Sequence, residues 1–263
     1  MKKALGALAA TLACIGGLTL LQWPRLRSQL TAGDLDPVQA QTEEILLRDR
    51  LRLLKVMPTL GFDNLIADWT FLNFFQYFGY SEARQLTGFG AAPEFFDVVI
   101  TRDPYSRLPY QFLSSSVTLF AGQPETTVQL LEKGLMQVTP TLPPDAFWLW
   151  RYKALDELLF LGDIEATIQS LEKVAEWAIQ SPLPDTEGYA ANAQRTAAFL
   201  RQNPASREVR ANSWVMIWNN AINEDVRQYA QLQIEALGYQ VFRDANRLRI
   251  EDRSPEGESS SAS

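Results

Sequence analysis

Apolar residues recur at intervals of three and four along most of this chain, which is the spacing of one face of an α-helix. Two stretches also repeat each other, because residues 119–133 and 159–173 align without a gap and are identical at nine of fifteen positions. Self-similarity at a fixed period of this length indicates a repeat architecture. The two clearest apolar stripes are Val128, Leu131 and Leu135 in the first copy, and Ile168, Leu171 and Ala175 in the second.

Each repeated unit has the pattern of a helical hairpin. A first apolar helix is expected to end at Gly122 or Gly162, because glycine adopts the left-handed conformation that closes a helix. The second helix follows within a few residues, with Glu125 or Glu165 in its first turn, where the helix dipole favours negative charge. One apolar stripe must pack on its partner helix and on the next hairpin, so we expect the units to stack.

Weaker copies of the pattern flank these two units, so we predict a helical repeat domain over residues 62–238 that closes at Gly238. Terminal repeats often depart from the consensus of their array. The further expected elements are a first helix over 64–79, its partner over 92–104, an inserted loop over 80–91 between them, and helices over 187–200, 206–221 and 223–238.

The segments on either side of this domain give separate predictions. Residues 36–57 predict a linking helix, with Asp36 as cap, Pro37 at the first helical position and Pro58 after its end. Glu44 and Arg48 of this helix have the spacing of an i,i+4 ion pair. The apolar positions of residues 239–252 alternate, which indicates a small β-hairpin. Residues 253–263 are polar and rich in serine, so we expect a disordered tail.

The first 24 residues have the pattern of a membrane anchor. The apolar stretch from Ala4 to Trp23 is long enough to cross a hydrocarbon layer of about 30 Å as a helix. A cleaved secretory signal is one alternative, although the stretch continues past its best small-residue site. Lipidation of Cys14 is another, although Thr11 stands where lipoprotein signals usually carry leucine. The length of the span favours an uncleaved anchor.

The charges beside this anchor indicate its orientation. Lys2 and Lys3 precede it and Arg25 and Arg27 follow it, so the positive-inside count is nearly balanced. A basic start before the first apolar run is the ordinary export pattern, which favours an N-terminus in the cytosol. We expect a single-pass membrane protein whose body lies in the periplasm or the thylakoid lumen, with the cytosolic side as the alternative.

Composition narrows the classes of function. The chain carries 24 Lys and Arg against 31 Asp and Glu, a net charge of −7, so we expect no nucleic-acid partner. It has no histidine and one cysteine, which removes the commonest general base and the usual nitrogen and thiolate metal ligands. We therefore predict no catalytic residue, no metal and no cofactor. The alternative is a carboxylate-dependent hydrolase built on Asp68, an acid within a very apolar helix.

The repeated units resemble tetratricopeptide repeats. The resemblance rests on the glycine, the acidic residue after it and the sequences "LEKGL" and "LEKVA" of the second helices, and it covers roughly residues 65–221. Thr127 and Thr167 stand where the consensus carries alanine, and Pro140 comes one residue late. The stretch "ADWTFLNFFQYFG" followed by "TRDP" is similar to membrane-anchored bacterial proteins of this type, some from oxygenic photosynthetic bacteria. The resemblance implies an all-α fold in which a right-handed array of helical hairpins follows the anchor.

In tetratricopeptide proteins, fixed positions of the first helices line a concave groove that binds peptides. The resemblance places this groove at positions ten and six residues before the glycine of each unit, or before Gln202 where a glycine is missing. The same aromatic positions are also consistent with core packing. The predicted groove residues are Trp69, Asn73, Phe112, Ser116, Tyr152, Asp156, Asn192 and Thr196.

Three functional hypotheses follow from this sequence. The first is a non-enzymatic, membrane-anchored scaffold whose groove binds a protein segment during assembly or maintenance of a membrane complex. A photosynthetic complex is the setting that the resemblance suggests, by analogy only. The second is a permanent structural subunit of such a complex, and the third is the hydrolase based on Asp68.

Overall fold

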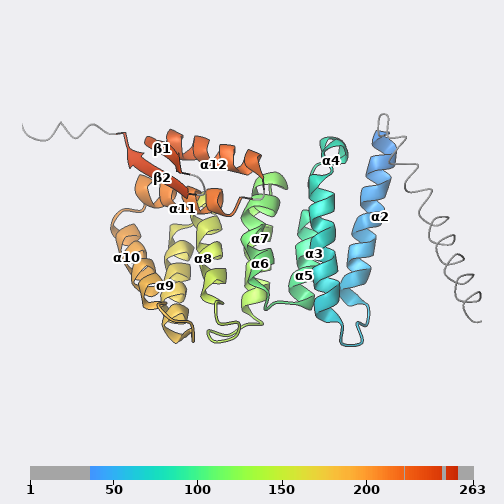
Figure 1. Cartoon of the computed structure of the whole chain (residues 1–263), viewed down its shortest axis with the longest axis horizontal. Helices are drawn as coiled ribbons and strands as arrows, with labels where there is room; N and C mark the ends of the chain where they lie inside the picture. Colours follow the sequence, from blue (N-terminus) through green and yellow to red (C-terminus); the bar gives the residue numbers. More distant parts are fainter. Residues whose placement is uncertain (1–35, 222, 245–246, 254–263) are drawn as a thin grey trace, which may run out of the picture.

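The computed structural model describes residues 36–221, 223–244 and 247–253. These residues are mostly helical and end in a two-stranded antiparallel sheet, which confirms the predicted helical class and the small C-terminal hairpin (Figure 1). The predicted anchor over residues 1–24 lies outside the described residues, and so does the tail beyond Arg253. In chain order the elements are α2 (Pro37–Val56), α3 (Asp63–Gly79), α4 (Ser81–Thr87), α5 (Ala92–Arg102), α6 (Arg107–Gln111), the π-helical η1 (Ser114–Phe120), α7 (Pro124–Leu135), α8 (Phe147–Asp156), the π-helical η2 (Glu157–Leu161), α9 (Ile164–Gln180), α10 (Glu187–Gln202), α11 (Arg207–Asn219), α12 (Glu224–Ala236), β1 (Tyr239–Asp244) and β2 (Arg247–Asp252).

The helices from α2 to α10 stand side by side in a row, and α12 and the hairpin lie across one end of its C-terminal half (Figure 1). Helix α5 packs against both α2 and α3, α7 packs against α5 and α8, and α9 packs between α8 and α10. Strands β1 and β2 pair with Val241 opposite Ile250, and β1 packs on α12. The row is therefore a stack in which each element is buried mainly by its neighbours.

The two repeated units bend at equivalent points. Gly122 and Gly162 both have a φ of 67°, the left-handed conformation that glycine adopts without strain. Both glycines follow a π-helical turn, and matched hydrogen bonds close the two bends, since Gln123 N donates to Val117 O at 3.0 Å and Asp163 N donates to Glu157 O at 2.9 Å. The predicted helix–glycine–helix pattern is confirmed at both positions.

Two parts of the stack differ from the predicted hairpin pattern. The insert over 80–91, predicted as a loop, contains helix α4, which packs on α2. The helices predicted over 187–200 and 206–221 are present as α10 and α11, but α11 packs mainly against α12 rather than against α10. Trp214, Ile217 and Trp218 of α11 are buried with α12 and the hairpin, and this apolar face draws the helix away from the row.

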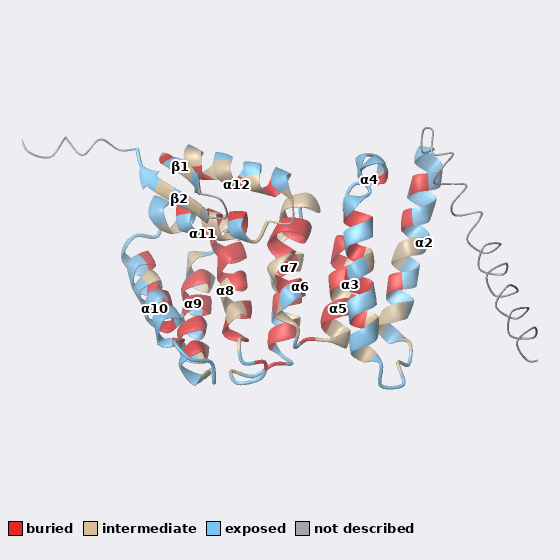
Figure 2. Ribbon diagram, in the orientation of Figure 1, coloured by how far each residue is buried: buried red, intermediate tan, exposed pale blue. Residues whose placement is uncertain are grey.

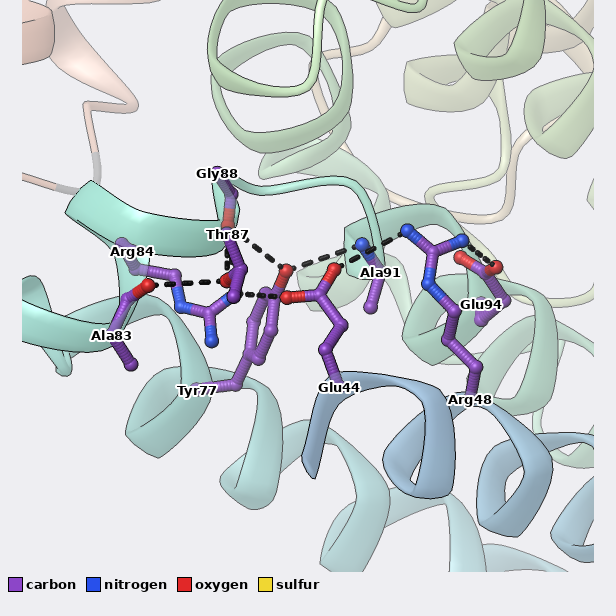
Figure 3. Close-up of polar contacts among 9 residues, drawn as sticks. All are labelled: Glu44, Arg48, Tyr77, Ala83, Arg84, Thr87, Gly88, Ala91 and Glu94. Atoms are coloured by element: carbon purple, nitrogen blue, oxygen red, sulfur yellow. Dashed lines mark hydrogen bonds and ion pairs between the residues drawn. The ribbon is translucent and has the colours of Figure 1, made fainter. Parts of the chain in front are cut away.

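Helix α2 is bound to the stack by an ionic cluster (Figure 3). Glu44 and Arg84, both over nine-tenths buried, form an ion pair at 2.9 Å between α2 and α4. Glu44 also accepts from Arg48 at 3.3 Å, which confirms the predicted i,i+4 pair, and Arg48 reaches Glu94 on α5 at 2.6 Å. The Arg84 guanidinium lies 3.8 Å above the ring of Tyr77. Helix α2 is thus the first helix of the stack, fixed to both α4 and α5.

The core consists of three clusters of buried apolar residues that meet at α8 and η2. Buried residues are prominent along α5, α7, α8 and α9 (Figure 2). Leu149 and Tyr152 of α8 belong to the cluster that extends toward α2. Phe147 and Leu158 belong to the cluster shared with α9 and α10, and Leu155 belongs to the one shared with α11 and α12. This central segment therefore connects the two ends of the molecule.

Candidate functional site

The predicted groove residues do not form one open strip. Trp69 is 62% exposed on α3, and beside it Asn73 is partly buried, with its amide donating to the Trp69 carbonyl at 2.6 Å. Phe112 is partly buried, with its ring edge-on to Phe75 at 5.5 Å. These three side chains come from neighbouring elements at the N-terminal side of the stack.

The next three predicted residues lie inside the protein. Ser116, Tyr152 and Asp156 are buried, so a docked segment cannot touch them without a rearrangement of the stack. The hydroxyl of Tyr152 accepts a hydrogen bond from Arg107 at 3.3 Å. The remaining two lie on α10, where Asn192 is exposed and Thr196, partly buried, donates to the Asn192 carbonyl at 2.9 Å.

The π-helical turns explain which positions are exposed. The prediction counts ten and six residues back from the end of each first helix as though that helix were regular. Helices α3 and α10 are regular, and there Trp69 and Asn192 point to solvent. The other two first helices end in η1 and η2, and one additional residue in a turn rotates the preceding side chains by about 100° around the helix axis. Of the counted positions before Gly122 and Gly162, Ser116, Tyr152 and Asp156 are accordingly buried, and Phe112 is partly buried.

Helix α3 presents a row of exposed apolar side chains that includes Trp69. The row has the spacing i, i+3, i+7 and i+10 of a single helical face. Its opposite face, with Phe71 and Phe74, is buried against α5 and its neighbours. The members of this α3 row are Phe62 (62% exposed), Leu65 (64%), Trp69 (62%) and Leu72 (60%).

A second feature of the surface is a small cavity of about 40 Å³ between α8, α9 and α10. Three aromatic rings form its wall: Tyr189 lies 5.5 Å from Phe147 and 5.4 Å from Trp148. Arg151 and Asn192 are the polar residues of its lining. The residues that line this Arg151 cavity are Phe147, Trp148, Arg151, Val174, Tyr189, Asn192 and Ala193.

Arg151 is an uncompensated cation in this setting. Burial lowers the pKa of its guanidinium, and no carboxylate contributes to the shift. Among the residues that the structure describes, none forms a hydrogen bond or an ion pair with Arg151. The side chain is only partly buried, and none of its nitrogens is among the buried atoms that lack a hydrogen-bond partner in the described structure.

Asp156 lies at the centre of a polar network inside the stack. It accepts hydrogen bonds from Ser114 and, at 2.6 Å, from Thr118, which in turn contacts Thr127 at 2.8 Å. Burial raises the pKa of the Asp156 carboxyl to about 7, the two hydroxyl donors lower it, and the neighbouring Glu157 carboxylate raises it. The network joins η1, α7 and α8, so it holds the two repeated units together.

Asp68, the acid proposed for a hydrolase, is exposed on α3. On the adjacent helix α5, Arg102 binds a different acid, Asp63, at 3.0 Å and the carbonyls of Leu54 and Met57 at 2.8 and 2.6 Å. Within the described part of the chain, no three acidic, histidine or cysteine side chains gather as a metal site.

Sequence reasoning missed the Arg151 cavity and the role of Asp156. The signal for the cavity was weak, because "FWLWRY" places an arginine among aromatics without showing which residues of α10 face it. For Asp156 the signal was its position six residues before Gly162 in an apolar helix, which is compatible with either a groove or a core.

Comparisons with family models, with curated proteins and with solved structures give no match. Among the described helices, none combines the length and the apolar character that a membrane crossing requires.

Proposed function

We propose that this chain is a non-enzymatic scaffold that is anchored to a membrane by its first 24 residues and binds a protein partner through a tetratricopeptide-like stack. The body is placed on the non-cytosolic side by the basic start of the anchor. Assembly or maintenance of a membrane complex is the process that such a tethered scaffold would serve. A photosynthetic complex remains an analogy drawn from the resemblance.

The observation that carries this proposal is the α3 row. Isolated apolar residues are normal on protein surfaces, but an aligned row on one helix is a site where another element packs. From Phe62 to Leu72 the row extends over about 15 Å, at 1.5 Å per residue. This length suits the apolar face of an amphipathic helix of the partner. The exposed carboxylate of Asp68 beside the row favours basic residues at the edge of that helix.

The position of the row also supports the proposal. Helix α2 is fixed to α4 and α5 by the Glu44–Arg84 cluster, and α3 packs on α5. The row is therefore held at the N-terminal side of the described stack.

A binding role agrees better than hydrolysis with the site of Asp68. A carboxylate-dependent glycoside hydrolase holds two acidic side chains on either side of the bond that it cleaves. Asp68 instead lies exposed on α3, next to Trp69 of the α3 row. We therefore assign no catalytic residue, and the Asp68→Asn variant is expected to leave any activity of the preparation unchanged.

Site-specific photocrosslinking tests the proposal. A benzophenone amino acid replaces Trp69 or Leu72 in the full chain, in its native membrane, and the same probe at Leu232 on α12 is the matched control because Leu232 is 61% exposed. We expect one protein adduct, identified by mass spectrometry, from positions 69 and 72 and not from position 232. The double variant Trp69→Ala and Leu72→Ala should remove co-purification of that protein.

Three outcomes would contradict the proposal. Adducts to lipid alone would identify the α3 row as a membrane contact. Adducts to a second copy of the chain would identify it as a self-association face. Identical adducts from Leu232 would show that the crosslinks are not specific to the row.

A further inference from the structure

The outward side of α2 is apolar, although α2 stands at one end of the described stack (Figure 1). Its exposed aliphatic side chains have the spacing i, i+7, i+8, i+15 and i+18, which places them on one helical face. The buried residues of the same helix, Ala40, Glu44 and Leu51, lie on the opposite side. The members of this α2 face, each between 60% and 75% exposed, are Val38, Ile45, Leu46, Leu53 and Val56.

An apolar outer face is unusual at the end of a helical stack. The terminal units of a repeat array ordinarily present a polar face to water. Helix α10, at the other end of the row, follows this rule (Figure 1). Its outward positions carry only small or polar exposed residues: Ala191, Arg195, Ala198 and Gln202. The α2 face lacks this property, which indicates that another element packs on it.

We propose that the α2 face pairs with the α2 of a second copy of this chain, antiparallel, about a two-fold axis near Leu46. Such an interface uses the same patch on both copies, so the patch must be complementary to itself. The exposed charges of α2 meet this condition, because Glu43 lies in its N-terminal half and Arg50 in its C-terminal half. Reversing one helix brings Glu43 beside Arg50 of the other copy. A parallel pair would place Arg50 beside Arg50, which is unfavourable.

The antiparallel orientation also matches the remaining side chains of the face. Val38 and Leu53 lie on opposite sides of Leu46 at similar distances along the helix, so Val38 of one copy meets Leu53 of the other. Thr42 and Asp49, both exposed in the middle of the face, are related in the same way. The Thr42 hydroxyl can therefore donate a hydrogen bond to the Asp49 carboxylate of the second copy.

Two other occupants of the face are less consistent with these residues or lie outside the described structure. A lipid bilayer would have to accept Asp49 in the middle of the apolar face, and a carboxylate in hydrocarbon is costly. Residues 1–35 of the same chain could fold back on α2. The experiment below separates both from a second copy.

The protein presents α2 in a form that favours pairing. Glu44 binds Arg84 at 2.9 Å, and Arg48 binds Glu94 at 2.6 Å, so the helix is already held on α4 and α5. Pairing then costs little further ordering of the backbone. If both copies are anchored in one membrane, as proposed above, their effective concentration is also raised. The inference goes beyond the proposed function and does not use the α3 row.

Disulfide crosslinking of the full chain in detergent micelles tests the pairing, after Cys14→Ser has removed the one native cysteine. Val38→Cys and Leu53→Cys are prepared as separate proteins and then mixed. We expect a linked dimer from the mixture but little from Val38→Cys alone, because two copies of residue 38 lie about 24 Å apart in this arrangement, at 1.5 Å per residue. Leu46→Cys, near the axis, should link to itself. Leu232→Cys, 61% exposed on α12, is the control and should not link.

Charge variants test the orientation independently. Glu43→Arg and Arg50→Glu should each weaken the dimer at least about tenfold, and the double variant should return to within about threefold of the wild type. Leu46→Glu should make the protein monomeric, whereas Leu232→Glu, a matched exposed leucine, should leave the dimer intact. Sedimentation equilibrium over a range of concentrations measures these affinities, and circular dichroism establishes that each variant is folded.

Several results would overturn the inference. The mass of a single copy at every concentration would leave residues 1–35 or the bilayer as the cover of the face. A dimer that persists in Leu46→Glu would place the association elsewhere, and self-linking of Val38→Cys as efficient as its linking to Leu53→Cys would exclude the antiparallel arrangement. Absence of a dimer with intact crosslinks from Trp69 would remove this inference alone. Loss of those crosslinks with an intact dimer would remove the proposed function alone.

Discussion

At the residue scale, the position six residues before the glycine holds Ser116 in the first repeated unit and Asp156 in the second. Both side chains are buried, yet only Asp156 can ionise. Its carboxyl receives two hydroxyl hydrogen bonds but no cation among the described residues, since Lys153 is paired with Glu157 at 2.5 Å. The interior therefore contains one carboxylate whose ionisation opposes folding.

This arrangement predicts a pH dependence of stability. The pKa of Asp156 is raised from 3.8 to about 7 in the folded chain, so between these values the folded state binds more protons than the unfolded state. The free energy of unfolding should therefore fall as the pH rises from 4 to 7, by up to about 1.4 kcal/mol per pH unit from this group, and stay level above 7. Asp156→Asn should remove this component, so the variant gains stability relative to the wild type at pH 8 but not at pH 4. Urea unfolding of both proteins at the two pH values measures it, and an equal difference at both pH values would contradict the assignment.

A second prediction concerns the glycine bends. Gly162 has a φ of 67° and open space around its α-carbon, so a methyl group there meets no atom and the cost comes from the backbone alone. Gly162→Ala should destabilise the protein by about 1 kcal/mol. Gly188→Ala is the control, because Gly188 also has open space but lies in α10 without a positive φ. Alanine should stabilise that helix by up to about 1 kcal/mol. Equal changes in the melting temperature for both variants would contradict this interpretation.

At the element scale, the sequence predicts the regular helices but not the π-helical turns. The i, i+3, i+4 stripes and the glycines located the second helices α7 and α9 and the bends before them. Neither η1 nor η2 has a recognisable sequence signal, because a π-helical turn uses the same residue types as an α-helix. As a result, the same count of residues leads to an exposed side chain at Trp69 and to a buried one at Tyr152.

The predictions of a loop over residues 80–91 and of α11 packing on α10 were wrong for a different reason. Residues 80–91 contain two glycines and a short polar run, so a loop was the natural expectation. A helix forms there because of a tertiary contact: the ion pair of Arg84 with Glu44, a residue forty positions away, holds α4 against α2. In the same way the partner of α11 depends on which apolar face is free at the end of the stack, and a single sequence does not encode that choice locally.

The ionic cluster of Figure 3 gives a prediction for the attachment of α2. Arg84→Gln leaves the buried carboxylate of Glu44 with only Arg48, so the free energy of unfolding should fall by roughly 3 kcal/mol, the lower end for breaking a buried pair. Replacing Glu44 and Arg84 together by leucine should cost less than Arg84→Gln alone. Arg52→Gln is the control, because its ion pair with Asp49 is exposed on the same helix and should contribute little. Additive losses in a double-mutant cycle would show that Glu44 and Arg84 do not interact.

At the scale of the whole molecule, the stack is held together by neighbours in sequence order, and α8 with η2 is the place where all three core clusters meet. Such quasi-one-dimensional proteins tend to lose structure from their ends. Helix α2 is the end of the row on the N-terminal side, and its outward face exposes Ile45, Leu53 and Val56. Helix α2 thus packs on the rest of the stack from one side only, whereas α8 contributes to all three clusters.

This difference predicts that the same Leu→Ala substitution accelerates amide exchange over a short segment in α2 and over a long one in α8. Leu51 of α2 and Leu149 of α8 are 2% and 1% exposed, so replacing either by alanine should cost about 2–5 kcal/mol where it occurs. Leu51→Ala should accelerate amide hydrogen exchange only in α2 and α4, because the remaining units keep their own neighbours. Leu149→Ala should accelerate exchange from α5 to α10 together, since α8 supplies side chains to both sides of the stack. Exchange that rises over the whole chain in Leu51→Ala would mean that the molecule unfolds as one unit, and α2 would then be part of a single cooperative core rather than the removable end of a row.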